Sequence, residues 1–254
     1  MNRFQGKRVI ITGGSGGIGK TTAKLFLEEG ATVLLVDLDE EKLQAVANEL
    51  GDRAHYAKAD VTKADEVEAY AKAAADKMGG VDIFFNNAGI EGIVKPLVDY
   101  PEDIFQKVLS VNVLGVWLGL KYVMPIMKQG GGGSVIITSS VAGLRGTPNV
   151  SAYVTSKHAV VGLMKVAALE GAADNIRVNT VHPSPVDNRM MRSLEEGFAP
   201  GGAAQAKEQF AKAIPLQRYA EETDVSKLVL FLASDDASFL TGGQFTVDGG
   251  QTAA

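Results

Sequence analysis

The sequence predicts one α/β domain built around a doubly wound parallel sheet. Short apolar runs rich in β-branched residues alternate with amphipathic helical segments along the chain, and no shift in composition divides that series. Repeated strand–helix units favour parallel strands with helices covering both faces of the sheet. We therefore interpret residues 1–254 as a single domain that carries one small insertion.

The first half of the chain provides four expected strands and three helices. Arg8–Thr12 is a short β-branched run that ends in glycines, and the amphipathic segment after it stops at Gly30. Charges on one helical face and a high alanine content indicate the later helices. The strands are expected at Arg8–Thr12, Thr32–Asp37, His55–Asp60 and Val81–Asn86, and the helices at Ile18–Glu29, Glu40–Leu50 and Ala64–Lys77.

The second half continues the alternation with longer helices. Glu102–Lys128 is expected as one helix with Pro125 near its end. Asn188–Pro215 breaks the pattern, because short apolar pieces there alternate with glycines and Pro200, and we expect it to be a substrate lid inserted into the domain. The remaining strands are expected at Ser134–Ser139, Ile176–His182 and Gln244–Asp248, and the remaining helices at Ala152–Ala172 and Thr223–Ala233.

The composition is that of an ordinary globular protein with a modest negative charge. Of the 254 residues, 46% are hydrophobic and 22% are charged. The net charge of −5 and the pI near 5.3 argue against a nucleic-acid partner. We expect no membrane partner, because no run of about 18 apolar residues is present. The apolar run near the start of the chain is too short for a signal peptide, so a cytoplasmic location is expected.

Two further chemistries are not expected from the residue counts. The chain has no cysteine, which excludes disulfides and thiol chemistry. Its three histidines, His55, His158 and His182, are too scattered in the sequence to indicate a metal site, and we expect none.

A glycine-rich loop, Thr12–Gly19, joins the first expected strand to the first helix. It reads T-G-G-S-G-G-I-G and contains both the G-x-G-x-x-G spacing and the related G-x-x-x-G-x-G spacing. Glycines let the backbone approach a pyrophosphate closely, and the free N–H groups at the helix start then bind its charge. A strand before the loop and a helix after it are the context that this motif needs, so the loop indicates a dinucleotide-binding Rossmann fold.

Asp37 ends the second expected strand, where it can select between the two nicotinamide dinucleotides. A carboxylate there can accept hydrogen bonds from an adenosine ribose diol and repels a 2′-phosphate. Leu38 follows at a position where an arginine would suit NADP. Lys20 and Lys42 are nearby cations that leave the alternative open. The sequence favours NAD.

Tyr153 and Lys157 stand four residues apart in a segment expected to be helical, and Ser140 precedes the tyrosine by thirteen residues. Positions i and i+4 share one face of a helix, so the ammonium should lie beside the phenol. A nearby cation lowers a tyrosine pKa, and such a tyrosine can exchange a proton near neutral pH. Together with the dinucleotide loop, these residues predict hydride transfer to or from an alcohol or carbonyl.

These motifs resemble the short-chain dehydrogenase/reductase family, in its branch of roughly 250 residues. The resemblance covers essentially the whole chain, and its motifs occur in the expected order: Thr12–Gly19, Asp60-Val61, Asn86–Gly89, Asn112, Ser140, Tyr153-x-x-x-Lys157 and Pro183. The family pattern commonly has glycine after that proline and threonine five residues after it. This chain has Ser184 and Asn188 at those positions, which puts the local backbone in question.

The resemblance implies a role for each matching residue. Tyr153 would be the proton donor or acceptor, Lys157 would depress its pKa and bind the nicotinamide ribose, and Ser140 would bond the substrate oxygen. Asn112 would hold a water in a proton relay. The expected cofactor-binding residues are Gly13, Ser15, Gly16, Gly17, Ile18, Gly19, Asp37, Leu38, Asp60, Val61, Asn87, Gly89, Tyr153, Lys157, Pro183, Val186 and Asn188, and the lid residues Met190, Met191 and Phe198 are expected to contact substrate.

The predicted function is an NAD-dependent oxidoreductase that interconverts a secondary alcohol and a ketone. Two alternatives stay open, an NADPH-dependent 3-oxoacyl-carrier-protein reductase and a dinucleotide-binding sensor without catalysis. The resemblance also implies a homotetramer with two-fold axes. The residues expected to form its contacts are Leu114, Trp117, Leu118, Lys121 and Tyr122, then Val161, Met164, Lys165 and Ala168, and in another interface Phe245–Ala254.

Overall fold

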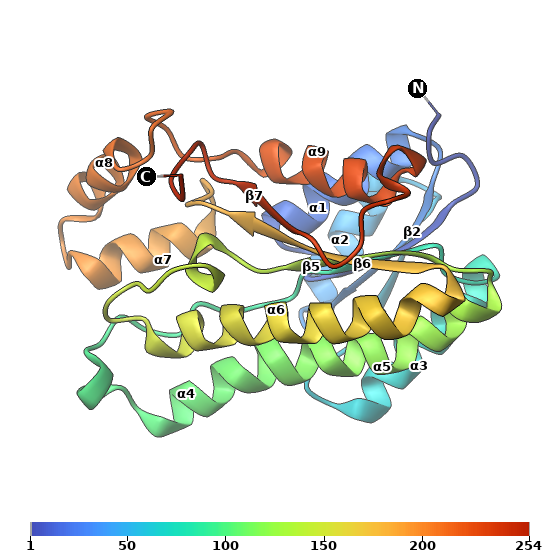
Figure 1. Ribbon diagram of the computed structural model, residues 1–254, viewed down its shortest axis with the longest axis horizontal. Helices are drawn as coiled ribbons and strands as arrows, with labels where there is room; N and C mark the ends of the chain where they lie inside the picture. Colours follow the sequence, from blue (N-terminus) through green and yellow to red (C-terminus); the bar gives the residue numbers. More distant parts are fainter. Residues whose placement is uncertain (1, 254) are drawn as a thin grey trace.

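The chain folds around one seven-stranded parallel sheet, described here by a computed structural model over residues 2–253. The first and last residues of the expected domain 1–254 lie outside the described residues. The strands are β1 (Arg8–Thr12), β2 (Thr32–Asp37), β3 (Ala54–Lys58), β4 (Ile83–Asn86), β5 (Gly133–Thr138), β6 (Ile176–Pro183) and β7 (Gln244–Val247). Their order in the sheet is β3-β2-β1-β4-β5-β6-β7, which confirms the doubly wound arrangement (Figure 1).

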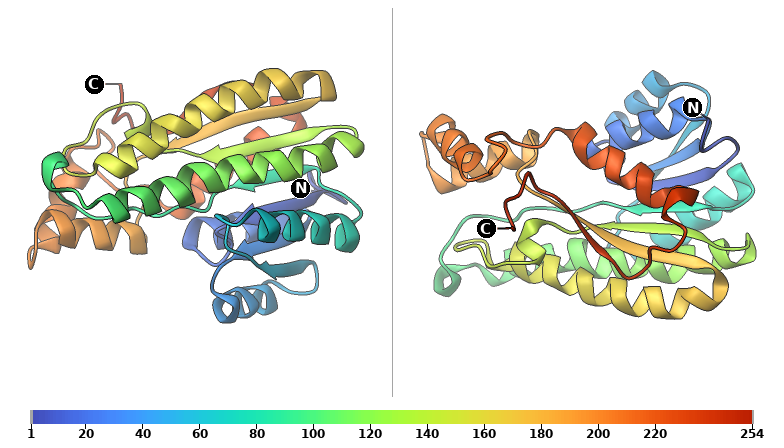
Figure 2. Two further views of the ribbon diagram at one scale, coloured as in Figure 1. Left: turned by 90° about the horizontal axis from the view of Figure 1, so that it is seen from below. Right: turned by 45° about the horizontal axis from the view of Figure 1, so that its top comes forward.

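Helices cover both faces of the sheet, as the two orientations in Figure 2 show. One face carries α3 (Ala64–Met78), α4 (Glu102–Leu109), α5 (Gly115–Gln129) and α6 (Ser151–Gly171), and the other carries α1 (Gly17–Glu28), α2 (Glu40–Leu50) and α9 (Glu222–Ala233). Shorter 3₁₀ turns are η1 (Leu97–Asp99), η3 (Val141–Gly143), η4 (Ala172–Asp174) and η5 (Asp235–Ala237).

Each face of the sheet has its own apolar core, because successive side chains of a strand point to opposite faces. In β1, Ile10 packs into the cluster under α3, α5 and α6, whereas Val9 and Ile11 pack into the cluster under α1, α2 and α9. All three side chains are fully buried. The near-continuous apolar runs of the strands follow from this burial on both sides.

The long helix expected at Glu102–Lys128 is present, and one turn within it is irregular. The helix runs without interruption over Glu102–Gln129, but residues Ser110–Leu114 form a π turn, η2, between α4 and α5. π turns inside helices occur most often at functional sites. This one contains Asn112, a predicted site residue.

That helix is also the only one among residues 2–253 that is long and apolar enough to cross a membrane by length and composition. In the structure it lies in the layer on the sheet, packed between α3 and α6. Its apolar side chains contribute to the core under that face, including Val116, Val123 and Met127. We read it as a core helix.

The apolar residues expected to form subunit contacts fall into two groups. Leu118, Val161, Met164 and Ala168 are buried in the chain's own core, so for these the prediction of an exposed contact surface is wrong. Both helices pack by these residues against the sheet. Trp117 is 43% exposed and Leu114 is similar, and Leu169 on α6, which was not predicted, is 81% exposed.

The segment expected to be a lid, Asn188–Pro215, forms two helices at one end of the molecule. They are α7 (Arg189–Phe198) and α8 (Ala203–Lys212), drawn in orange in Figure 1. Met191, Ile214 and Tyr219 form a small apolar core of their own beneath them.

The strand order fixes where a site can form. Sequence order reverses between β1 and β4, since β2 and β3 extend from one side and β5, β6 and β7 from the other. In such sheets ligands bind in the crevice outside the carboxyl ends of the strands at this switch point. The glycine loop after β1 and the Asn-Ala-Gly segment after β4 both begin there.

Candidate active site

The glycine loop lies at the carboxyl end of β1 with its glycines required by geometry. Gly13 has φ of +68°, a region that favours glycine. A Cβ at Gly19 would collide with the Gly13 carbonyl, and a Cβ at Gly17 would collide with the Glu222 carboxylate. Gly16 is the N-cap of α1, and no side chain caps that helix start. The loop therefore leaves helix N–H groups free to bind an anion.

Asp37 faces the glycine loop from the end of β2. Its carboxylate accepts hydrogen bonds from the backbone N–H of Ser15 at 3.0 Å, from the Ser15 hydroxyl at 2.7 Å and from the N–H of Leu38 at 2.8 Å. The Leu38 side chain is 61% exposed. The structure thus brings together three predicted cofactor residues from two separate loops.

Asp60 and Val61 follow β3 and are held by local contacts. The Asp60 carboxylate accepts from the N–H and the hydroxyl of Thr62, at 2.9 and 2.7 Å. The Asp60 N–H donates to the Glu66 carboxylate at 2.7 Å. The Val61 side chain lies so close to the backbone of Gly115 that a Cβ there would meet it at 2.8 Å. This packing ties the loop after β3 to the start of α5.

Asn87 joins the ends of three strands. Its N–H donates to the Thr12 hydroxyl at 2.9 Å, its amide group donates to the Thr12 carbonyl at 3.1 Å, and its amide oxygen accepts from the Thr138 hydroxyl at 3.0 Å. The neighbouring Asn86 is buried and donates to the Val116 carbonyl at 3.0 Å. The sequence motif indicated these asparagines, but the threonines that hold Asn87 were missed, although each ends a strand.

Asn112 fastens the π turn to the loop after β4 and to α6. Its amide oxygen accepts from the Ile90 N–H at 2.8 Å, and its amide group donates to the Ile90 carbonyl at 2.9 Å and to the Ser156 hydroxyl at 3.0 Å. A Cβ at Gly89 would lie 3.2 Å from the Asn112 side-chain oxygen and 3.6 Å from the Lys157 Nζ. The bare glycine backbone therefore leaves room beside that lysine.

Tyr153 and Lys157 share one face of α6, as their spacing predicted. The Lys157 Nζ lies 5.5 Å from the centre of the Tyr153 ring. It donates a hydrogen bond to the Thr138 carbonyl at 2.8 Å, and the lysine side chain is buried. Burial lowers the pKa of Lys157 to about 8.

The expectation that the pKa of the Tyr153 phenol lies below its usual value is wrong. Burial raises the pKa of Tyr153 to about 12, the hydrogen bond with Ser140 opposes that rise, and the charge of Glu91 adds to it. The lysine ammonium is directed at the Thr138 carbonyl, and its own burial disfavours its charge. The phenol is therefore protonated at neutral pH.

Ser140 lies just past β5, in contact with the end of β6. Its hydroxyl oxygen accepts from the Ala142 N–H at 3.1 Å and lies 3.5 Å from the Pro183 carbonyl. The Ser140 hydroxyl also lies near the Tyr153 phenol, whose pKa it lowers. Behind Ser140, the buried His182 lies 2.9 Å from the Ser140 carbonyl oxygen, a contact that sequence reasoning missed.

The segment Pro183–Asn188 departs from the family pattern without backbone strain. Ser184 has no positive φ, so the usual glycine is not required there. Val186 forms a parallel bridge with Ala220 that uses the Asp187 N–H and the Pro185 carbonyl, so the bridge leaves the N–H and C=O of Val186 itself unengaged. The Asn188 side chain caps α7 by accepting from the Met191 N–H at 3.1 Å.

The expected lid segment, residues 188–215, is joined to the rest of the domain by an ion pair. Both terminal guanidinium nitrogens of Arg189, Nη1 and Nη2, donate to the Glu91 carboxylate, at 2.9 and 3.1 Å. The Glu91 side chain is only 8% exposed, whereas that of Arg189 is 74% exposed. Gly197 packs against Val94 in the same contact region.

All four basic residues of the lid are paired with carboxylates. Arg189 binds Glu91, Arg192 binds Asp187 and Glu195, Lys207 binds Asp187, and Lys212 binds Glu208. These pairs satisfy the cations within the protein. The described lid therefore offers no unpaired cation for a substrate anion.

The predicted substrate residues of the lid pack largely within it. Met191 is buried in the small core beneath the two helices. Phe198 makes an edge-to-face contact with Phe210, with ring centres 5.5 Å apart. Met190 is half-buried. The sequence identified these residues by apolarity alone, which does not separate lid packing from substrate contact.

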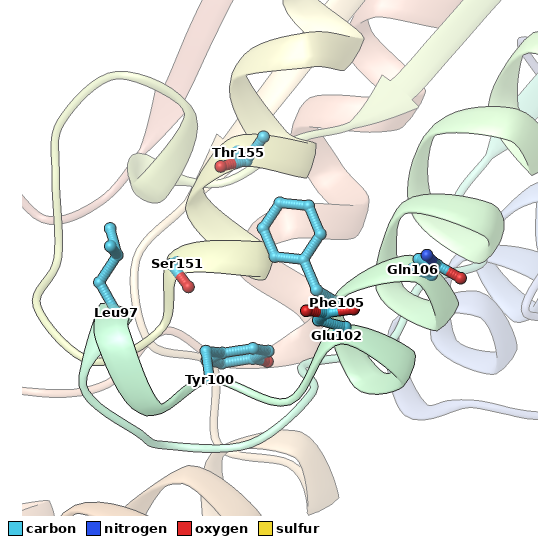
Figure 3. Close-up of a pocket in the computed structure, with 7 residues that line it drawn as sticks. All are labelled: Leu97, Tyr100, Glu102, Phe105, Gln106, Ser151 and Thr155. Atoms are coloured by element: carbon cyan, nitrogen blue, oxygen red, sulfur yellow. The ribbon is translucent and has the colours of Figure 1, made fainter.

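Two surface hollows have no predicted catalytic residue in their lining. The larger, of about 540 Å³, is bounded by η1, α4 and the start of α6, and Figure 3 shows its lining. The smaller, of about 340 Å³, lies between the ends of β6 and β7 and the residues before α9. The larger is lined by Leu97, Tyr100, Glu102, Phe105, Gln106, Ser151 and Thr155, none of which is a predicted site residue. Within residues 2–253, no group of three or more metal-ligating side chains is present.

Comparisons with known proteins match almost the full chain. A family model described as enoyl-(acyl carrier protein) reductase matches residues 13–252. Levodione reductase of Leifsonia aquatica is 40% identical over 99% of this chain and 96% of its own length, and a cyclohexanol dehydrogenase of Acinetobacter is 37% identical over 99% and 97%.

Solved structures agree with the sequence relatives. The crystal structure of levodione reductase superimposes with a TM-score of 0.96 at 39% identity, covering 99% of each chain. The crystal structure of an NAD⁺-bound xylitol dehydrogenase gives a TM-score of 0.93 at 33% identity, covering 97% of this chain and 99% of the other.

Proposed function

The chain belongs to the short-chain dehydrogenase/reductase family of oxidoreductases, and from this we propose that it interconverts a secondary alcohol and a ketone with NAD(H). The observation that carries the proposal is that Tyr153 lies beside buried Lys157 and near the Ser140 hydroxyl, at the carboxyl ends of the strands. A phenol and a hydroxyl there can both bond one substrate oxygen.

The residues present fit a nicotinamide dinucleotide. The uncapped start of α1 offers N–H groups to a pyrophosphate, and the Asp37 carboxylate at the end of β2 offers acceptors to a ribose diol. The free N–H and C=O of Val186 offer a backbone pair to a carboxamide. Lys157 and the space beside Gly89 would adjoin the second ribose. When bound, the dinucleotide supplies or accepts the hydride.

Tyr153 handles the proton. Since the phenol holds its proton at neutral pH, it can donate that proton to a ketone oxygen as the oxygen gains negative charge. In the reverse direction the phenol first releases its proton to solvent, and the phenolate then takes the proton of the alcohol. The Ser140 hydroxyl orients the same oxygen. Lys157 stabilises the phenolate by its charge. Asn112 fixes the loop after β4 and helix α6, which lie on either side of the site.

The substrate proposed is neutral and largely apolar. Support comes from the lid, whose basic residues are all paired with carboxylates and so offer no cation to a substrate anion. Relatives named for levodione and for cyclohexanol act on neutral compounds of this kind. We further propose that residues 188–215 act as a lid over this substrate, excluding water when closed.

The first alternative is reduction of a 3-oxoacyl group carried on a protein, with NADPH. The description of the matching family model, which names an acyl carrier protein, favours it. Asp37 argues against NADPH, because its carboxylate would face the 2′-phosphate. A sensor without catalysis is the second alternative, and the complete set of Asn112, Ser140, Tyr153 and Lys157 argues against it.

The test is a rate comparison with the purified chain. Neutral cyclic ketones, matched carboxylated ketones and a 3-oxoacyl thioester are each assayed with NADH and with NADPH. Highest kcat/KM for a neutral ketone with NADH is the expected result. Preference for the thioester with NADPH would establish the first alternative, and dinucleotide binding without turnover of any substrate in the series would favour the sensor.

A homotetramer remains our proposal for the assembly. Support comes from the exposed apolar side chains of the long helices, Leu114, Trp117, Val166 and Leu169, and from Phe239 near β7, which is fully exposed. Two-fold pairing of such faces would cover them. Light scattering at micromolar concentration should give about four times the chain mass of 26.7 kDa, and a stable monomer would contradict it.

A further inference from the structure

His182 is a buried histidine whose two ring nitrogens both face hydrogen-bonding partners. It lies in β6 immediately before Pro183 and is 0% exposed. Its Nδ1 lies 2.9 Å from the Ser140 carbonyl oxygen, and its Nε2 lies 2.8 Å from the Thr180 hydroxyl oxygen. These contacts fix the plane of the imidazole between β6 and Ser140, the second residue after β5.

The partners determine which nitrogen carries the proton. The Ser140 carbonyl can only accept a hydrogen bond, so Nδ1 must donate. The Thr180 hydroxyl can then donate to Nε2. The hydroxyl can also donate to the Gly243 carbonyl at 3.3 Å, but the contact with Nε2 at 2.8 Å is the shorter one. Burial lowers the pKa of His182, which agrees with a neutral ring.

His182 supports Ser140 where the backbone of the sheet no longer can. The ladder between β5 and β6 ends with the bond from the Ser139 N–H to the Val181 carbonyl at 2.9 Å. Pro183 has no N–H, so β6 cannot donate the following backbone bond. The imidazole takes over beyond that point by donating to the Ser140 carbonyl.

We propose that His182 is a positioning residue, whose neutral imidazole protonated on Nδ1 holds the backbone of Ser140 so that the Ser140 hydroxyl meets the substrate oxygen. This inference rests on the role proposed for Ser140. The hydroxyl itself is placed by the Ala142 N–H and lies against the Pro183 carbonyl, so a shift of the Ser140 backbone moves it relative to Tyr153. Displacing a reacting group by about 1 Å can reduce a rate by about 10²-fold.

Two substitutions separate positioning from packing. His182→Leu removes both ring nitrogens and keeps much of the volume, whereas His182→Asn retains an N–H donor close to the place of Nδ1. The leucine variant is expected to lose about 10- to 100-fold in kcat. The asparagine variant should recover most of that loss. NADH affinity, measured by fluorescence titration, should stay near the wild-type value in both.

His158→Leu is the matched control. Its Nδ1 also lies near a backbone carbonyl, that of Val154 at 3.0 Å, but the side chain is exposed on α6. It should keep the wild-type kcat. A wild-type chain without turnover of any alcohol or ketone would refute the proposed function. The positioning role is refuted, and the proposed function is kept, if the wild type converts a substrate and His182→Leu keeps the full kcat. The same holds if His182→Asn recovers none of the kcat that His182→Leu loses.

Nitrogen-15 NMR of the ligand-free wild type tests the proton position without any activity. The chain has three histidines, so long-range nitrogen–proton correlation spectra resolve each ring, and the spectrum of His182→Asn assigns the missing one. The expected pattern for His182 is the neutral Nδ1–H form at neutral pH. A neutral Nε2–H form or a charged ring would overturn the inference, even if His182→Leu fails to fold.

Discussion

The carboxyl ends of the strands and the lid are held in place by different interactions. At the strand ends, buried or partly buried uncharged hydrogen bonds fix the polar residues, as Asn87 and Asn112 illustrate with their bonds to neighbouring segments. In the lid, partly exposed ion pairs such as Arg189–Glu91 and Lys207–Asp187 make the connections. Buried networks fix geometry, whereas exposed ion pairs contribute little free energy and weaken with salt.

This difference predicts that substitutions in the two regions affect different steps of the reaction. Groups held by the strand ends should control the rate of the chemical step, because their geometry is set before substrate arrives. Groups of the lid should control how long the substrate stays, because closing and opening change only their contacts. Substitutions in the two regions therefore test the comparison directly.

The largest effect is expected for Tyr153→Phe. Removing the hydroxyl takes away the proton donor and keeps the ring, so kcat should fall by about 10² to 10⁴-fold. Tyr122→Phe on α5 is the control, since Tyr122 is only half-buried and is not a predicted site residue, and it should keep wild-type kcat. Equal kcat for Tyr153→Phe and the wild type in steady-state assays would remove Tyr153 from the mechanism.

The next largest effect is expected for Asp37→Ser. Losing the carboxylate removes the repulsion of a 2′-phosphate and the acceptors for a ribose diol, so the ratio of kcat/KM for NADH over NADPH should fall about 100-fold, or about 3 kcal/mol. Asp39→Asn is the control, because Asp39 is the N-cap of α2 and serves that helix. An unchanged cofactor ratio in Asp37→Ser would show that another residue selects the dinucleotide.

Lys157 should make stability depend on pH. Its pKa is about 8 in the folded chain and 10.5 for an unperturbed lysine. Between pH 8 and pH 10.5 the unfolded chain therefore binds more protons than the folded chain, and the free energy of unfolding rises with pH. From pH 7 to pH 10 the wild type should gain about 2 kcal/mol relative to Lys157→Met. Tyr153, whose pKa is raised, opposes this only at higher pH.

Urea unfolding of both chains at the two pH values gives this difference. Other titrating groups are common to both chains, so their contributions largely cancel. Parallel stability changes in the two chains would mean that Lys157 is not desolvated by the fold.

The smallest effect is expected for Arg189→Gln in the lid. Breaking the pair with Glu91 should raise KM a few-fold, leave kcat nearly unchanged and speed amide hydrogen exchange in α7, because a partly exposed pair contributes about 1 kcal/mol or less. Lys212→Gln, which breaks an exposed pair within α8, is the control. A large loss of kcat in Arg189→Gln would place the lid in the chemical step and end the contrast between the two regions.

The sequence predicted the strand-end region well for physical reasons. Glycine spacing, the strand-end Asp37 and the i, i+4 pair of Tyr153 and Lys157 depend on local geometry, which sequence order determines. All seven expected strands are present, with ends within two residues of expectation. β4 begins at Ile83, two residues later than expected, and the preceding Asp82 is joined to Arg8 by both its backbone N–H and its carboxylate.

Features that depend on distant contacts could not be predicted in this way. The direction of the Lys157 ammonium is set by a carbonyl of β5, so the effect of burial on the Tyr153 pKa did not follow from spacing. His182 gains its role from Ser140, 42 positions away. The apolar lid residue Met191 proved to be part of a core that only the fold defines.

The central claim is direct hydride transfer between a secondary carbinol carbon and NAD, with Tyr153 moving the proton. The most direct measurement incubates the wild type with NAD⁺ and cyclohexanol deuterated at the carbinol carbon, then determines the mass of the reduced cofactor. The account predicts one deuterium in NADH with the wild type, and almost no reduced cofactor with Tyr153→Phe. Reduced cofactor without deuterium, or equal labelling by both chains, would contradict it.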